Sequence, residues 1–268
     1  TRSSQSFLRL FHFRKGIAQM IYWFSGTGNS RFVAEKLAEL TNDTAQNIFM
    51  PYTEEHDGIV GLVFPVYVWM PPFFVSKFID NFLQNIAPQT YKYVVMTCGD
   101  DVGKTLDLVK KHGFVPDGAY SLFMPNTYVC LPGFDVDGDK VRQDKLGKSL
   151  ARISHIAQEV NDRRKTVEIH EGLLPRTKTY LLGKLFGSFV RDDKRFRAGK
   201  CCNSCGECTK ACPAGNITIG NGQPQWGGNC TGCLACYHTC PKHAIDFARR
   251  TSGKGQYLFR RHAGETGK

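Results

Sequence analysis

The chain has 268 residues, of which 41% are hydrophobic, and a formal net charge of +11. A chain of this length can bury a sizeable core and has room for one mid-sized domain and one small domain. Its longest uncharged stretch, 59–76, contains three prolines and is shorter than the roughly 20 apolar residues of a transmembrane helix, so no membrane span is expected. The basic excess favours an acidic partner or an anionic surface over nucleic acid, because no nucleic-acid-binding signature accompanies it. A merely solvated surface is the alternative.

The first 19 residues carry basic side chains and no acidic ones, and Met20 is a natural candidate for the true start. We interpret residues 1–19 as an N-terminal extension, which is either a cloning remnant, misassigned upstream sequence or a transit-like segment.

From Met20 onwards the sequence predicts a strand, a loop and a helix. The apolar run 20–24 has strand length, and Val33, Leu37 and Leu40 recur at helical spacing. The intervening loop consists of Ser25, Gly26, Thr27, Gly28, Asn29 and Ser30. Its N–H groups and hydroxyls suit a phosphate at the helix N-terminus, where the dipole favours an anion, and a purely structural turn is the alternative. The loop lacks the Gly-Lys-Ser/Thr ending of a Walker A motif and the third small residue of a dinucleotide fingerprint.

Further segments alternate between strand and helix patterns. Strands are predicted at 59–66, 93–97 and 119–124, and helices at 72–83, 103–112 and 139–163. Such alternation, with a ligand loop at the carboxyl end of a strand, predicts an α/β fold with a doubly wound parallel sheet.

The loop at 25–30 resembles the phosphate loop of flavodoxins, which binds the phosphate of FMN without a cationic side chain. This resemblance implies a flavodoxin-like five-stranded sheet in the order 2-1-3-4-5, with FMN between the first and third strands. It also implies that the loops after the third and fourth strands hold the isoalloxazine ring, through Pro65, Val66, Tyr67, Val68, Trp69, Thr97, Cys98, Gly99 and Asp100.

Several of these side chains have two interpretations. Tyr67 and Trp69 are candidates for stacking on a flavin, with core packing as the alternative. Cys98 lies beside the ring or is a buried structural thiol. Asp100 and Asp101 would penalise an anionic reduced flavin if their charges faced the ring.

Residues 166–197 are predicted to form a linker that contains an amphipathic helix. Its apolar stripe consists of Leu181, Leu182, Leu185, Phe186, Phe189 and Val190, set among basic residues. We interpret it as a helix that packs the C-terminal part of the chain against the first domain. The alternative is a helix that lies on a membrane surface.

Nine of the eleven cysteines fall between residues 201 and 240, at a spacing typical of metal ligands rather than disulfides. With no secretory signal upstream, a reducing cytoplasm is expected. The pattern C-x2-C-x2-C-x3-C-P occurs twice with an offset of 28 residues, at Cys202, Cys205, Cys208 and Cys212 and again at Cys230, Cys233, Cys236 and Cys240. The repeat indicates an internal duplication. Zinc is the alternative metal, but zinc-binding motifs do not use this cysteine spacing.

Each run resembles one half of a bacterial ferredoxin with two 4Fe-4S clusters. In that pattern the fourth cysteine crosses to the other cluster, which implies the ligand sets Cys202, Cys205, Cys208, Cys240 and Cys230, Cys233, Cys236, Cys212. Two clusters, each of charge about −2, would lower the net charge to roughly +7. Cys201 lies outside the register and is interpreted as a spare thiol, with a redox-active or substitute ligand as the alternative.

Together the motifs resemble the EFR-type flavodoxin/ferredoxin fusion proteins of anaerobic bacteria over nearly all of residues 20–262. The expected organisation is an extension at 1–19, a flavodoxin-like domain at 20–165, a linker at 166–197, an α+β ferredoxin-like domain at 198–250 and a basic tail at 251–268. The resemblance implies an iron–sulfur flavoprotein that passes electrons between FMN, two 4Fe-4S clusters and a redox partner protein. The alternatives are an FMN-dependent reductase of a small acceptor such as a quinone, and a redox sensor. The tail is expected to be solvated, with a docking arm as the alternative.

Overall fold

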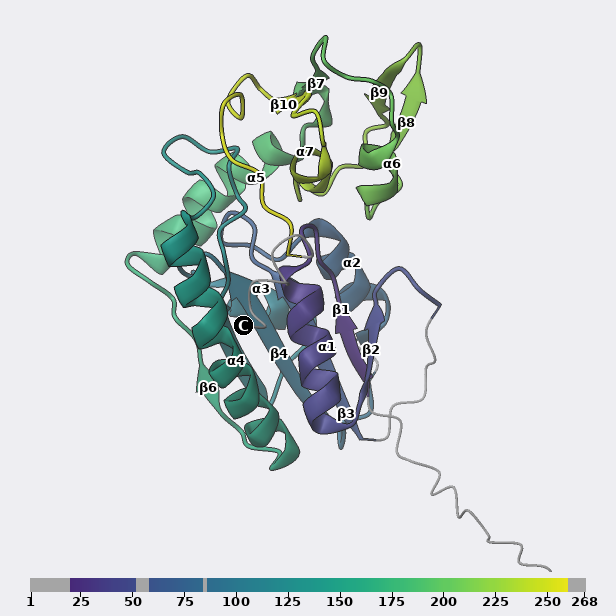
Figure 1. The fold of residues 1–268 in the computed structure, drawn as a ribbon. Coiled ribbons are helices and arrows are strands. Elements are labelled where there is room, and N and C mark those ends of the chain that lie inside the picture. The colour runs from purple at the N-terminus through teal and green to yellow at the C-terminus, as the bar shows by residue number, and fades with distance from the viewer. Residues whose placement is uncertain (1–19, 52–57, 84–85, 260–268) are drawn as a thin grey trace, which may run out of the picture.

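The computed structural model describes residues 20–51, 58–83 and 86–259, so the expected extension at 1–19 and the last nine residues of the expected tail lie outside the described residues. Figure 1 shows an α/β part and, above it, a smaller C-terminal part. Among the described residues no helix is long and apolar enough to cross a membrane.

A six-stranded parallel sheet in the order β2-β1-β3-β4-β5-β6 forms the centre of the α/β part. Its strands are β1 (Met20–Trp23), β2 (Thr44–Asn47), β3 (Ile59–Pro65), β4 (Tyr91–Cys98), β5 (Gly118–Phe123) and β6 (Val167–Glu168). The central strands β3 and β4 are buried along almost their whole length, which explains why their sequences are continuous apolar runs rather than alternating ones.

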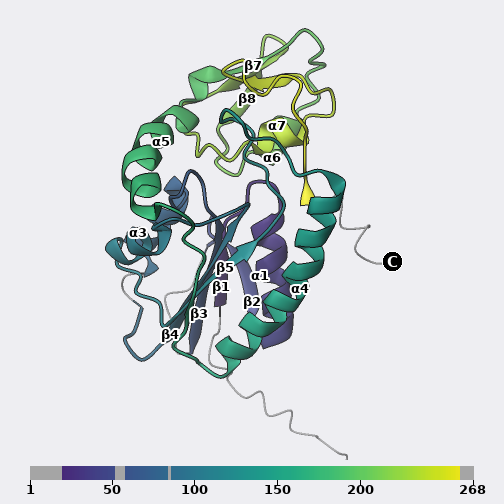
Figure 2. The ribbon, with the colours of Figure 1, turned by 90° about the vertical axis from the view of Figure 1, so that its left-hand side faces the viewer.

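Helices cover both faces of this sheet (Figures 1 and 2). On one face, α1 (Asn29–Thr41) and α4 (Asp139–Asn161) share an apolar core with the strands, and on the other α2 (Phe73–Asn81) and α3 (Thr105–Lys111) do so. Because the strands are parallel, the carboxyl ends of β1, β3, β4 and β5 meet at one edge of the sheet, where doubly wound folds bind their ligands.

The predicted five-stranded sheet was wrong at one edge. The order of the first five strands is confirmed, but β6 adds a sixth within the segment predicted as linker. It pairs with β5 through Ala119↔Val167 and Tyr120↔Glu168. A strand of two residues is too short to show a periodic pattern, so no sequence pattern predicted it.

The smaller part contains the same unit twice, at the offset of the cysteine runs. The first unit has α6 (Glu207–Ala211) and β8 (Ile217–Gly220), and the second has α7 (Ala235–Thr239) and β10 (Ile245–Phe247). β8 pairs with β9 (Gln223–Trp226), and β10 pairs with β7 (Phe196–Ala198). The pair Ile217↔Trp226 of the first two strands corresponds to Ile245↔Ala198 of the second two, because Ile245 lies 28 positions after Ile217 and Trp226 lies 28 positions after Ala198. The duplication read from the sequence is therefore also present in the backbone.

Two segments join the parts. A π-helix, η2 (Thr177–Gly183), continues into α5 (Lys184–Arg191), and a short 3-10 turn, η3 (Asp193–Arg195), leads into β7. After β10 the chain returns to the α/β part, where Tyr257 and Leu258 are buried. Up to residue 259, the tail thus differs from the expected solvated tail.

Candidate functional site

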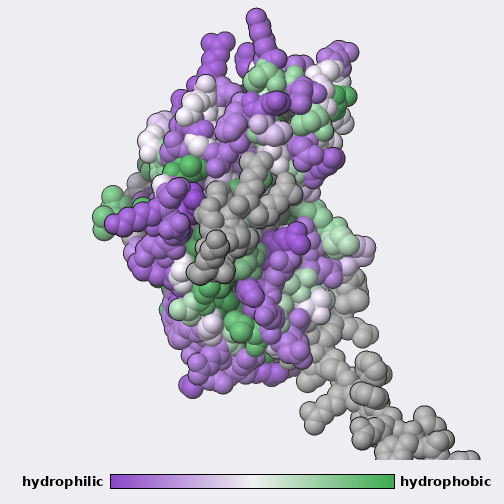
Figure 3. All heavy atoms as spheres, in the orientation of Figure 1, coloured by the Kyte–Doolittle hydropathy of each residue, from purple (hydrophilic) through white to green (hydrophobic). Residues whose placement is uncertain are grey.

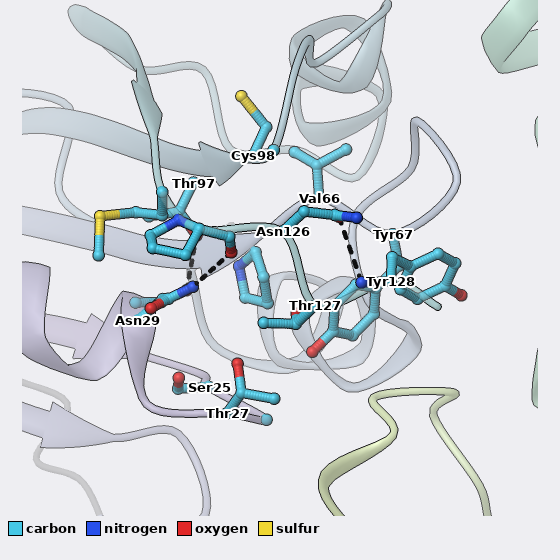
Figure 4. A pocket seen from close by; sticks show the side chains of 16 residues that line it. Ser25, Thr27, Asn29, Val66, Tyr67, Thr97, Cys98, Asn126, Thr127 and Tyr128 are labelled. Atoms are coloured by element: carbon cyan, nitrogen blue, oxygen red, sulfur yellow. Dashed lines mark hydrogen bonds between the residues drawn. The ribbon is translucent and has the colours of Figure 1, made fainter. Parts of the chain in front are cut away.

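A cavity of about 40 Å³ lies at the sheet edge formed by the carboxyl ends of β1, β3, β4 and β5 (Figure 4). Four loops contribute its walls: Ser25, Gly26, Thr27, Asn29 and Ser30; Pro65, Val66 and Tyr67; Thr97, Cys98 and Gly99; and Met124, Pro125, Asn126, Thr127 and Tyr128. The first three are the loops in which the sequence placed an FMN site, and the topology brings them together.

The loop after β1 presents a free helix N-terminus to this cavity. Gly28 precedes α1 with a φ of 101°, a left-handed conformation that glycine adopts without strain. Its N–H donates to Ser25 Oγ at 3.0 Å, which closes the loop. No side chain of the described residues caps α1, so the N–H groups of its first turn are available to an anion.

A strained turn holds Tyr67 at the cavity wall. Tyr67 and Met70 form two backbone hydrogen bonds across Val68 and Trp69, whose φ angles are 50° and 57°. Two successive positive φ angles are typical of a type I′ turn, which usually requires Asn and Gly. A valine and a tryptophan there cost of order 1–3 kcal/mol each, a strain that is commonly found at functional sites.

Two stacked tyrosines form one end of the cavity. The rings of Tyr67 and Tyr128 lie 5.3 Å apart at an angle of 17°, and burial raises the pKa of both well above its usual value. Among the described residues the Tyr128 hydroxyl has no well-formed hydrogen bond, although it lies close enough to the Cys130 thiol to interact with it. A buried hydroxyl without a well-formed hydrogen bond is costly, so this group fits a ligand that carries polar atoms.

Four residues predicted to hold the cofactor do not line the cavity. Gly28 lies on the outer side of its loop, and Val68 and Trp69 form the turn just described. Asp100 is exposed, and its neighbour Asp101 forms an ion pair with Lys178 at 2.5 Å. Both carboxylates nevertheless contribute to the raised pKa of Cys98, which lines the cavity, so their charges act at its edge.

The loop at 124–128 was missed, although the rule that ligands bind at the carboxyl ends of strands applies to β5 as much as to β3 and β4. Cys98 lines the cavity but is buried, and burial raises its pKa far above that of an ordinary thiol. It is therefore a protonated and poorly nucleophilic thiol at neutral pH.

The cysteines of the C-terminal part fall into two groups. Cys202, Cys205, Cys208 and Cys240 line a single small cavity of about 10 Å³. These four cysteines are the first ligand set implied by the ferredoxin resemblance. Here Cys205 is exposed.

The second group, Cys212, Cys230, Cys233 and Cys236, is more deeply placed. Burial raises the pKa of Cys230 to about 11 and those of Cys233 and Cys236 further, and the neighbouring thiols of the group contribute to these three increases. The thiolate form that a cluster requires would thus depend on bonding to iron.

The fit to clusters is also visible in the backbone. The N–H of Asn216 points at Cys212 Sγ, and that of Ala244 points at Cys240 Sγ, both at 3.3 Å. These bonds are related by the same offset as the two runs and are of the kind that tunes an iron–sulfur centre. Among the described residues no three potential ligands converge on one metal ion. Each cysteine of a 4Fe-4S cluster binds its own iron, so such a cluster does not require this convergence.

The two sites touch each other through Gly26. A Cβ atom added to this residue would lie 2.8 Å from Cys233 Cβ and 2.8 Å from Tyr67 Oη. The thiols of Cys233 and Cys230 also contribute to the raised pKa of Tyr67. The phosphate-type loop, the tyrosine pair and the second cysteine group are therefore in direct contact.

Comparison with known proteins bears on the cysteine region. A family described as "4Fe-4S dicluster domain" matches residues 201–245, which include both complete runs. This part of the chain is a 4Fe-4S dicluster ferredoxin domain. Its chemistry is electron transfer, because iron–sulfur clusters of this type accept and donate single electrons.

No curated protein matches the chain. Among solved structures, one titled "The Structure of Trp Repressor Binding Protein from Bacillus subtilis" is similar at 17% identity, over 52% of this chain and 96% of that one, with a TM-score of 0.35. At this TM-score the similarity carries no argument about function.

Proposed function

We propose that the protein is an iron–sulfur flavoprotein that binds FMN in the sheet-edge cavity and passes electrons between it, two 4Fe-4S clusters and a redox partner protein in a reducing cytoplasm. The observation that carries the proposal is the contact between Gly26, Tyr67 and Cys233, which makes the cavity and the second cysteine group neighbours. When bound, FMN exchanges electrons singly or in pairs, whereas the clusters exchange them singly.

The residues at the cavity suit FMN in two respects. The open N-terminus of α1 and the hydroxyls of Ser25 and Thr27 would bind its phosphate without a cation. Tyr67 and Tyr128 offer an aromatic wall for the ring, and the Tyr128 hydroxyl, which has no well-formed hydrogen bond, could donate one to it.

The placement of the cysteines gives the clusters an order. The group of Cys230 and Cys233 adjoins the cavity, while the group containing the exposed Cys205 faces solvent. A partner protein would therefore exchange electrons with the outer cluster, and the inner cluster would connect it to FMN.

One observation favours the alternative of a reductase for a small, apolar acceptor. A second cavity of about 320 Å³ has Tyr67, Met70, Phe73 and Thr231 among its lining residues, and Tyr67 lines both cavities. An acceptor bound there would lie beside the same tyrosine pair.

Anaerobic purification followed by iron, sulfide and flavin analysis tests the proposal. We expect about eight irons and about eight sulfides per chain, as two 4Fe-4S clusters require, together with one FMN. Absence of flavin, or fewer irons, would refute the corresponding half of the proposal. Turnover with a panel of small acceptors then separates the two readings, because saturation by one acceptor above the rate of free FMN would exclude a pure carrier.

A further inference from the structure

Exposed leucines gather on the segment that joins the two parts. Of the described side chains, Leu173 and Leu174 before η2 are 84% and 73% exposed, and Leu181 and Leu185 on η2 and α5 are 63% and 64% exposed. Figure 3 shows apolar side chains that protrude at the left edge of the molecule, where this segment lies in Figure 1, with hydrophilic side chains around them. Single exposed leucines are common on proteins, but four within 13 residues form a patch that calls for a partner.

The joining helix is covered only in part. Thr179, Gly183 and Gly187 are buried against the α/β part, and Val190 is buried against the C-terminal part, where Phe186 and Phe189 are partly buried. An ordinary surface helix places its leucines inward and its polar residues outward. Here Leu181 and Leu185 point outward, although the sequence stripe predicted that they would face the core.

The charge on this segment has one sign. Residues 173–191 contain Arg176, Lys178, Lys184 and Arg191 and no acidic residue. Lys178 is neutralised by Asp101, but Arg176 and Lys184 are exposed and form no ion pair with any described residue. The leucine patch is therefore flanked by uncompensated positive charge.

We propose that this segment docks the protein on an anionic lipid surface, with the leucines in the interfacial region and the cations among the lipid head groups. Exposed apolar side chains flanked by Lys and Arg on one helix are the features of helices that lie in the membrane interface. A second copy of the chain is a poorer occupant, because a symmetric contact through this face would bring the same cations together. The inference does not depend on which cofactors the protein binds.

Docking in this orientation has a consequence for the sites. The inner side of the same segment contacts the Val68–Met70 turn at Gly183. Val190 contacts Gly232, which lies beside Cys233 of the second cysteine group. The membrane surface would thus be about one helix diameter, roughly 10 Å, from the elements that form the candidate cofactor sites.

Flotation of the full chain with lipid vesicles tests the proposal. We expect the protein to float with vesicles that contain phosphatidylglycerol, much less with phosphatidylcholine alone, and less at high salt, because the head-group attraction is screened. The double variant Leu181→Glu/Leu185→Glu should reduce the bound fraction about tenfold, since it places two charges in the interface.

A matched control is the double variant Val141→Glu/Leu150→Glu on α4, whose side chains are 49% and 42% exposed in the parent protein. It should float like the parent. Circular dichroism of both variants checks that they are folded. Absence of flotation with anionic vesicles, or equal flotation of the Leu181→Glu/Leu185→Glu variant, would refute the proposal. So would light scattering that shows a dimer which this variant dissociates, because the patch would then be a protein interface.

Discussion

Gly26 is the residue at which the two candidate sites meet. The sequence explained it only as part of a phosphate-type loop, and that interpretation did not anticipate a contact with a cysteine more than 200 positions away. In the structure no side chain fits at this position, because the space for a Cβ atom is occupied by Cys233 and the Tyr67 hydroxyl. The glycine thus permits the close approach of the two sites.

Substitution Gly26→Ala should therefore displace Cys233 or Tyr67. We expect a loss of stability of about 1–3 kcal/mol from this overpacking, together with reduced retention of the cofactors. Thermal unfolding and iron and flavin content measure both effects. The control is Gly147→Ala in α4, where the added Cβ meets no atom, and which should be roughly 0.5–1 kcal/mol more stable than the parent. Equal behaviour of the two variants would contradict this account.

A second prediction at the scale of residues concerns the ninth clustered cysteine. Cys201 is exposed and does not line the cavity formed by Cys202, Cys205, Cys208 and Cys240. Cys201→Ala should therefore keep the full iron content. Cys205→Ala should lose one cluster, about four irons per chain, as measured by iron analysis and by the visible absorption of the clusters. If Cys201→Ala loses as much iron as Cys205→Ala, the ligand assignment is wrong.

At the scale of elements, long periodic segments were predicted well and short ones were not. The helices α1 to α4 and the strands β1, β3, β4 and β5 lie within a few residues of their predicted positions, because their apolar runs extend over several turns or strand residues. No position was predicted for the four-residue strand β2. β6 and the turn at Val68 could not be predicted, since a two-residue strand has no period and turn rules exclude valine from positive φ. The outward leucines of η2 and α5 were missed because a stripe in the sequence does not say which side of a helix is covered.

The returning segment at 251–259 is a further element that sequence composition misjudged, because its basic residues looked like a solvated tail. Phe259 donates its N–H to the carbonyl of Thr27 at 3.0 Å and stacks on Phe32 with ring centroids 4.2 Å apart.

Two further side chains of this segment bind the α/β part. The Tyr257 hydroxyl donates to Asn29 Oδ1 at 3.0 Å, and the Lys254 ammonium donates to the carbonyls of Val129 and Phe134. The segment therefore holds the loop after β1 from the outside.

Phe259→Ala should loosen that loop. We expect a stability loss of about 2 kcal/mol, from the lost ring stacking and apolar contact, and weaker binding of FMN to the flavin-free protein. Chemical denaturation and a fluorescence titration with FMN measure these effects. The exposed residue Val115, which is remote from the loop in the fold, provides the control Val115→Ala, for which neither quantity should change. Unchanged FMN affinity in Phe259→Ala would show that the segment does not support the loop.

At the scale of the whole molecule, the two parts share their cores. Cys233 and Ala235 pack in the apolar cluster of β3 and α2, and Val68 and Val129 pack with Phe196 and Phe247 of the C-terminal part. The sequence predicted two domains that the linker helix packs together, but motifs and spacing identify local units and not the surfaces by which these units pack. Stability of one part should therefore depend on the other.

Removal of iron should accordingly destabilise the α/β part as well. We expect chelation of the clusters to increase hydrogen exchange in β3, although none of its residues is a cluster ligand, because the inner cysteine group is part of the core that covers it. Mass spectrometry of the iron-loaded and iron-free protein measures this change. Unchanged protection in β3, with loss confined to α6, α7 and their strands, would mean that the parts are energetically independent.

The repetition of the cysteine unit also has a consequence for the reduction potentials of the two clusters. Two copies of one motif with the same ligands are placed in unlike surroundings, one against the α/β part and the other beside solvent at Cys205. Adding an electron to a cluster adds negative charge, and a poorly polarisable environment penalises that charge more than water does. The inner centre should thus have the lower reduction potential of the pair, so that an electron travelling outward moves downhill. The different surroundings of two identical motifs would in this way favour electron transfer from the inner cluster to the outer one.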